Sequence, residues 1–342
     1  MVALVLHLSY EQYQHATRGR NRQYELLAGI RSLTNVAAVA ISGDGRLIVL
    51  ANYDGCIRLF RCEGPAELPP PPKQRGRAII DLSPDGRMLA ISGQGPRVLI
   101  WSIDRGEVAL EIDAGEVESP RVKFSPDGKL LATVDGPRGV VEMWDLRSGL
   151  LNGRIRGPRE GVKACEFSPD GRVMALAGRD GSVALHAVAG GLECWRVQGQ
   201  PSLVMCLAFS PDGSRLASAS SLEGCVRLWT VADGRPVGTI GERLVRIRAM
   251  GFSRQGTLFV STAEDGSLSS YHVASRRRLT KQQVNAAVFT ELSLAMNCDR
   301  LVTGHDDGMV RLWDTSRIVE SMGDDGPLAE EAQEESGVLA EI

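Results

Sequence analysis

Ser83-Pro84-Asp85-Gly86 is one copy of a four-residue phrase that recurs along the chain and decides its fold. The other copies, two of them weaker, begin at Ser42, Ser125, Ser168, Ser210, Ser253 and Asn297. A mostly aromatic column follows them, made of Phe60, Trp101, Trp144, His186, Trp229, Tyr271 and Trp313. Members of this column are 41, 43, 42, 43, 42 and 42 residues apart. A period held through seven units indicates a repeat architecture.

Each unit has the pattern of four short strands separated by turns. In the fourth unit, residues 162–167, 172–178, 182–188 and 192–197 are strand-like. The first two runs flank Pro-Asp-Gly, where proline presets φ and glycine accepts a positive φ. Asp180-Gly181 is a hairpin signal between the second and third runs. One such unit cannot bury both faces alone, so we expect the units to stack radially.

The chain resembles the WD40-repeat family over roughly residues 22–317, with its fullest signature at residues 301–314. The resemblance implies an all-β fold, a seven-bladed β-propeller of four-stranded antiparallel blades. It also implies that Thr303, Asp307 and Trp313 take part in a buried hydrogen-bond network. We expect Trp101, Trp144 and Trp229 to be structural in the same column. The Gly-His dipeptide that precedes the first strand in the family is absent from every unit.

The ends of the chain differ in composition from the repeats. Residues 24–29 are expected to form a strand that completes the last blade as a clasp; the alternative is a helix through residues 11–27. We therefore expect an N-terminal arm at residues 1–21, a propeller at residues 22–317 and an acidic tail at residues 318–342. The tail carries eight acidic and no basic residues. Such segments are usually solvated.

Charge and cysteine usage limit the class of protein. The chain has 39 basic and 42 acidic residues, a net charge of −3, and without the tail the remainder is mildly basic at +5. This is too little and too dispersed to indicate a nucleic-acid-binding protein. Seven cysteines without metal-ligand spacing favour a reducing compartment, so we expect a cytoplasmic protein. No run approaches the roughly 18 apolar residues of a membrane helix.

The sequence contains no recognisable catalytic, cofactor-binding or metal-binding motif. It lacks a nucleophile elbow, a phosphate-binding loop and a histidine pair with metal spacing. His186 belongs to the aromatic column, which favours a core role. His305 lies in a turn of the WD40 pattern, and the Asp-Gly pairs lack the alternating ligands of a calcium loop. We therefore expect no enzyme activity and no cofactor.

The expected binding surface is the face of the propeller on which the first strand of each unit opens. The opening residues are Ala37, Ala78, Pro120, Lys163, Met205, Arg248 and Glu291. Arg77, one place before Ala78, departs from an apolar pattern, and burying it unpaired would be costly. The candidate partner-binding residues form an arginine-rich rim, namely Arg77, Arg121, Arg156, Arg159, Lys163, Arg246 and Arg248. The alternative is that these are scattered solubilising charges.

The resemblance favours a non-catalytic scaffold that binds protein partners, including an acidic segment, as a subunit of a larger assembly. The alternative function is an RNA- or ribonucleoprotein-binding module. It would use Arg18, Arg20 and Arg22 together with Arg276-Arg277-Arg278. A further feature, Pro69-Pro70-Pro71-Pro72, has two interpretations. It is a stiff connector on an edge strand or a polyproline II ligand for a partner domain.

Overall fold

The computed structural model describes residues 25–32, 34–62, 67–115, 117, 120–241, 246–283, 289–294, 300–305 and 308–314. Its strands are β1 (Glu25–Arg31), β2 (Val36–Ile41), β3 (Leu47–Asn52), β4 (Ile57–Arg61), β5 (Glu67–Leu68), β6 (Ile79–Leu82), β7 (Met88–Ser92), β8 (Arg97–Ser102), β9 (Glu107–Asp113), β10 (Arg121–Phe124), β11 (Leu130–Asp135), β12 (Val140–Asp145), β13 (Leu151–Arg156), β14 (Val162–Phe167), β15 (Val173–Gly178), β16 (Ser182–Ala187), β17 (Glu193–Gln198), β18 (Val204–Phe209), β19 (Arg215–Ser220), β20 (Val226–Thr230), β21 (Pro236–Ile240), β22 (Ile247–Phe252), β23 (Leu258–Ala263), β24 (Ser267–His272), β25 (Arg278–Gln283), β26 (Phe289–Leu294), β27 (Arg300–His305) and β28 (Met309–Asp314). The described residues contain no helix.

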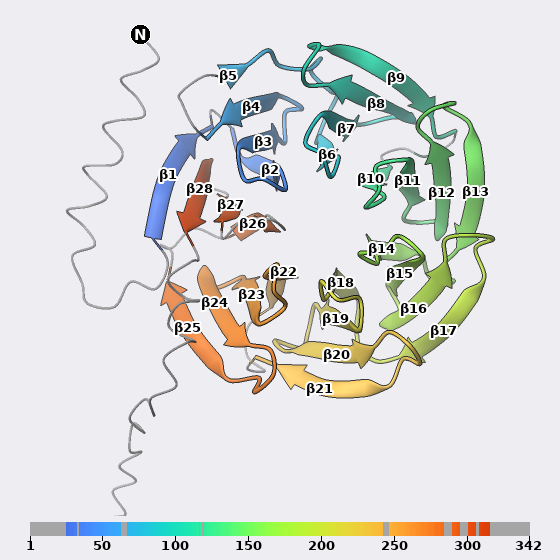
Figure 1. Ribbon diagram of the computed structural model, residues 1–342, viewed down its shortest axis with the longest axis vertical. Coiled ribbons are helices and arrows are strands. Elements are labelled where there is room, and N and C mark those ends of the chain that lie inside the picture. Colours follow the sequence, from blue (N-terminus) through green and yellow to red (C-terminus); the bar gives the residue numbers. More distant parts are fainter. Residues whose placement is uncertain are drawn as a thin grey trace, which may run out of the picture.

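These strands form seven four-stranded sheets arranged around a central axis (Figure 1). Within each sheet, neighbouring strands pair antiparallel, as in β14-β15-β16-β17. The first strand of each unit lies nearest the axis and the fourth lies outermost. The expectation of an all-β propeller with four-stranded antiparallel blades is confirmed. The four strands expected in the fourth unit agree with β14 to β17 to within one residue at each end.

The recurring phrase forms the turn between the first and second strands of a blade. Ser168 Oγ donates a 2.6 Å hydrogen bond to Asp170, and Asp170 accepts one of 3.0 Å from the amide of Arg172. Gly171 takes a φ of +71°, which glycine alone adopts at little cost. These bonds hold the pKa of the Asp170 carboxyl below its ordinary value, with the Ser168 bond as the largest cause. The turn is therefore a self-contained unit.

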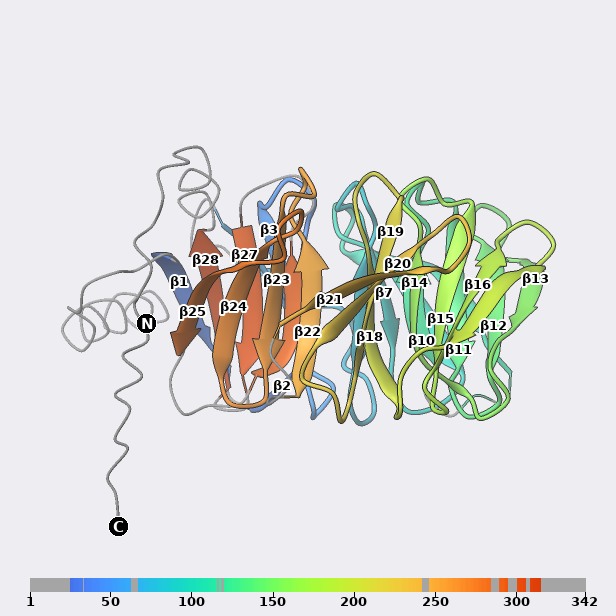
Figure 2. The ribbon, with the colours of Figure 1, turned by 90° about the horizontal axis from the view of Figure 1, so that it is seen from below.

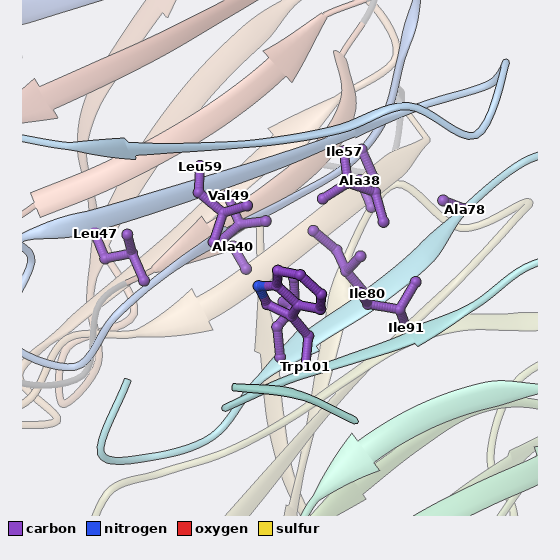
Figure 3. Packing of buried hydrophobic residues seen from close by; sticks show 12 residues of the cluster. Ala38, Ala40, Leu47, Val49, Ile57, Leu59, Ala78, Ile80, Ile91 and Trp101 are labelled. Carbon is purple, nitrogen blue, oxygen red and sulfur yellow. The ribbon is translucent and has the colours of Figure 1, made fainter. Parts of the chain in front are cut away.

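The core lies between adjacent blades. One cluster joins the first two blades, with Ala40, Val49 and Leu59 facing Ile80 and Trp101 across the gap (Figure 3). Trp101 is buried, as are Trp229 and Trp313. Trp144 is partly buried against the next inter-blade cluster. The aromatic column is thus a set of packing residues, one face of each blade covering the next.

The ring is closed by strands from the two ends of the described chain. Strand β1 pairs antiparallel with β28, and Leu26 lies opposite Trp313. The last blade therefore has the order β1-β28-β27-β26. Figure 2 shows β1 and β28 side by side at the edge of the ring. The expected clasp is present as a strand; Tyr24 and the arm at residues 1–21 lie outside the described residues.

Candidate functional site

The inner strands all begin at one end of the ring, which we call the top face. It comprises the starts of the first strands, the loops from fourth to first strands, and the turns between second and third strands. Backbone hydrogen bonds tie these segments together, such as Val162 N to Gly136 O at 2.8 Å and Glu264 N to Arg246 O at 2.8 Å. A residue at the start of an inner strand is therefore held by a neighbouring turn.

A β-bulge lies at the start of most inner strands. Pairing slips by one residue at Ala37, Lys163, Met205 and Arg248, so these residues have no partner on the second strand. A bulge bends the strand and re-aims the side chain. The last blade has its slip at Thr290, between Phe289 and Glu291. The expectation that Glu291 opens this strand is therefore wrong by one residue, because the phrase used for counting is degenerate there.

Four cations from three successive blades gather at the top face. Arg77 precedes β6, Arg121 opens β10, Lys163 is the bulged residue of β14 and Arg179 follows β15. We call these four residues the cation cluster. Burial lowers the pKa of the Lys163 ammonium, and the charges of Arg121, Arg179 and Arg77 lower it further. Each of the three arginines is therefore near enough to Lys163 to repel its ammonium.

No carboxylate of the described residues forms an ion pair with the cation cluster. Arg77 is exposed; it donates a 3.1 Å hydrogen bond to the Ala37 carbonyl and lies 5.3 Å from the Tyr53 ring centroid. Lys163 and Arg121 are half-buried. Positively charged side chains that are not paired with a carboxylate give this part of the surface a positive potential, which attracts negatively charged ligands.

The other expected members of the rim are in different surroundings. Arg248 donates a 2.6 Å hydrogen bond to Glu264, whose carboxylate also lies 3.7 Å from Arg246. Glu264 therefore compensates both arginines. Arg156 ends β13 and Arg159 lies in the loop after it; both are exposed. Sequence reasoning missed Arg179, because it follows a second strand rather than opening a first one.

A second charged group lies further along the same inner strands. Lys123 Nζ lies 3.2 Å from Glu166 and 3.8 Å from Asp81, and Asp81 accepts a 2.7 Å bond from the amide of Phe124. Burial raises the pKa of both carboxyls, and Lys123 opposes that shift. Glu166, followed by Asp81, raises the pKa of Lys123 against the effect of burial. The group joins three inner strands through their side chains.

Buried hydrogen bonds connect the aromatic column to the second strands. Trp313 Nε1 donates to Thr303 Oγ1 at 2.9 Å, and Thr303 Oγ1 lies 2.9 Å from His305 Nε2. Trp144 donates in the same way to Thr133 at 2.9 Å. The roles expected of Thr303 and Trp313 as partners in one network agree with this geometry. Asp307 lies outside the described residues.

Comparison with known proteins bears on this architecture. The family described as "WD domain, G-beta repeat" matches residues 149–186, 192–230 and 282–314. These segments contain the strand-turn-strand units just described. The chain carries WD40 repeats in these three segments and has the fold of a β-propeller.

Curated relatives resemble this WD40 propeller at low identity. It is 27% identical to "Telomerase protein component 1" of Rattus norvegicus over 68% of the chain and 9% of that protein. It is 26% identical to "Protein groucho" of Drosophila melanogaster over 43% of the chain and 21% of that protein. It is 28% identical to "Protein LST8 homolog" of the same fly over 44% of the chain and 51% of that protein. The matched regions span about half of these relatives or less.

The WD40 propeller replaces the family histidine by glutamine in one blade. Gln200, in the loop before β18, donates to Ser218 Oγ at 3.0 Å and to the Ser218 carbonyl at 2.9 Å. Trp229 Nε1 donates to the same hydroxyl at 2.8 Å. A Cβ on Gly199 would lie 2.3 Å from the Trp229 ring, so glycine is required there. Gly199-Gln200 thus takes the place of Gly-His, which a search for histidine alone missed.

Reactive groups of the described residues are in protective surroundings. Burial raises the pKa of the Cys165 thiol to about 12, which keeps it protonated at neutral pH. Burial also lowers the pKa of His186, whose ring lies in the core. The six cysteines of the described residues are in the reduced, thiol form, and these residues contain no group of three or more metal-ligating side chains. They also contain no helix long and apolar enough to cross a bilayer.

Proposed function

We propose that this WD40 propeller is a non-catalytic, cytoplasmic scaffold subunit that binds an acidic segment of a protein partner on its top face. In this proposal the ring has seven blades, residues 1–21 are an arm and residues 318–342 are a tail. Propellers of this family typically serve protein interactions, which supports the class of function. The cation cluster is the observation from which we infer that the partner segment is acidic.

The electrostatics of the cluster favour an anionic ligand. Lys163 sits among three arginines, and the described residues supply no carboxylate for any of the four cations. Each exposed charge pair contributes only about 0–1 kcal/mol. Several pairs acting together on one peptide would give useful affinity. Arginine also binds carboxylates with a fixed, bidentate geometry, which adds specificity.

The test is affinity capture with the intact chain and two double variants. The first, Arg77→Glu/Lys163→Glu, reverses the cluster. The second, Arg172→Glu/Arg235→Glu, gives the same change in net charge at exposed turns on the opposite end of the ring, where both arginines already have acidic neighbours. A partner retained by the parent and by the second variant, but lost by the first, supports the proposal. Equal capture by all three overturns it.

A second candidate function is RNA or ribonucleoprotein binding. Arg276, Arg277 and Arg278 lie consecutively at the turn between β24 and β25, and all three are exposed. Arg276 has a φ of 60°, which is unusual for a non-glycine residue. Phosphate contacts would make affinity fall steeply with salt, by roughly 0.7 log units per contact per tenfold change for single strands. Measured binding of a single-stranded RNA with no such slope removes this candidate.

A further inference from the structure

The proline run between the first two blades lies at the outer edge of the ring. It follows β5, which is only two residues long and pairs through Leu59 with Leu68 and Phe60 with Glu67 (Figure 1). Prolines have no amide hydrogen, so they cannot continue this ladder along β4. The outer strand of the first blade therefore ends where the prolines begin.

The conformation of the run follows from its covalent structure. Each proline fixes its own φ near −65°, and each residue before a proline is restricted to extended backbone. Pro69 to Pro72 therefore form about one turn of a polyproline II helix, which has three residues per turn. Residues three apart share an edge of such a helix, so Pro69 and Pro72 lie on the same edge.

Burial distinguishes the edges of this helix. Pro71 is buried, whereas Pro69, Pro70 and Pro72 are exposed. One edge therefore packs on the propeller, and the Pro69/Pro72 edge and the Pro70 edge face outward. If the run only linked the two blades, the exposure of the Pro69/Pro72 edge and of the Pro70 edge would have no purpose. They are the surface that a proline-binding groove grips.

Both ends of the run are fixed to the propeller. Leu68 packs against the core cluster of the first two blades. At the other end, the Gln74 side chain donates a 2.8 Å hydrogen bond to the Pro72 carbonyl, and the Gln74 amide donates to the Gly55 carbonyl at 3.0 Å. Lys73 Nζ lies 3.3 Å from Asp54. The ligand is therefore pre-ordered, which reduces the entropy lost on binding.

We propose that Pro69–Pro72 is a docking ligand for a partner domain with an aromatic-lined proline-binding groove. This site is separate from the cation cluster and does not depend on an acidic partner. Its function would be to bring a second protein to the outer edge of the scaffold.

The test is a titration of the full chain into three isotope-labelled domains, an SH3, a WW and an EVH1 domain, followed by NMR. We expect saturable shifts at the groove aromatics of at least one domain. Pro69→Ala/Pro72→Ala should weaken this binding at least tenfold, and the matched control Pro236→Ala, at an exposed proline in β21, should leave it within twofold.

Competition makes the result independent of the folding of the variants. A synthetic peptide of residues 67–74 should displace the full chain from the same domain, and a peptide with both alanines should not. The absence of saturable shifts in all three domains overturns the proposal. Equal binding by the parent and the double variant also overturns it, because the ligand would then lie elsewhere.

Discussion

Lys123 Nζ lies 3.2 Å from a carboxylate oxygen of Glu166 on the adjacent blade. With Asp81 at 3.8 Å, this single ammonium serves two carboxylates that burial makes costly to ionise. The three residues occupy equivalent positions on three inner strands, each two places before the serine of the turn. Asp81, Lys123 and Glu166 belong to three separate blades. Their interaction therefore depends on how these blades pack against one another.

Removing the ammonium should destabilise the ring in a pH-dependent way. Lys123→Met leaves two carboxylates without their cation, and we expect a loss of roughly 2–3 kcal/mol at pH 7, below that for fully buried pairs because the side chains are partly exposed. Burial raises both carboxyl pKa values in the folded state. Protonation therefore favours folding, and the loss should shrink as pH falls from 7 toward 5.

Denaturant unfolding of the parent and the variant across this pH range measures the difference. Glu166→Gln is the matched control, because it retains the Lys123–Asp81 pair and should cost less. The turn aspartates have lowered pKa values, so their contribution to stability is lost as pH falls. This contribution is the same in the parent and in both variants, and it therefore cancels when their free energies of unfolding are compared. A Lys123→Met deficit that stays constant from pH 7 to 5 would contradict this account of the group.

Gln200 is predicted to be a structural hydrogen-bonding residue. Gln200→Leu leaves the Ser218 carbonyl without this donor in a buried site, and we expect a loss of about 1–3 kcal/mol in the free energy of unfolding. Gln200→His can still donate to the serine, as the family histidine does, and should lose less. Chemical denaturation of both variants is the measurement. If leucine and histidine prove equally tolerated, the Trp229–Ser218–Gln200 network has no energetic role.

The clasp is predicted to protect the edge of β28. Deleting residues 1–28 removes the first part of β1 and exposes part of that edge. An unpaired edge strand is a template for association with other chains. We expect aggregation or a clearly lower melting temperature, measured by size-exclusion chromatography and calorimetry. Deletion of residues 1–21 is the control and should retain the pairing. A shorter chain that is as heat-resistant and monodisperse as the control would argue against the clasp.

The acidic tail is predicted to compete weakly for the cation cluster. Residues 318–342 carry eight acidic side chains and no basic ones. Removing them should tighten the binding of an acidic partner at low salt and change little at 1 M salt, where the Debye length is about 3 Å. Titrations of both chains at two ionic strengths measure this effect. Identical affinities at low salt would exclude the tail from the mechanism.

The sequence predicted the blades well because the information for them is local. Ser168, Asp170 and Gly171 build their turn from three neighbouring residues, and this turn recurs at a constant period. Pairing of β1 with β28 was also predictable, since the last unit lacked a fourth strand of its own. These features depend on hydrogen bonds and φ values that short segments determine.

The site could be predicted only in part because it depends on contacts between blades. Arg77, Arg121 and Lys163 were identified from their positions on the inner strands. Glu264, which compensates Arg246 and Arg248, lies at the end of a second strand about 16 residues away. Arg179 was missed for the same reason. Comparing the first strands of the repeats with one another does not show which side chains from the neighbouring turns contact the residues on those strands.

The most direct test of the account is the binding of a fluorescent decaglutamate peptide, measured by anisotropy at low salt. We predict saturable binding to the full chain, at least tenfold weaker binding to Arg77→Glu/Lys163→Glu, and an affinity within twofold of the parent for Arg172→Glu/Arg235→Glu. Circular dichroism melting of each protein verifies that the fold is retained. Equal weakening by the two double variants, or by neither, would contradict a specific acidic-segment site at the cation cluster.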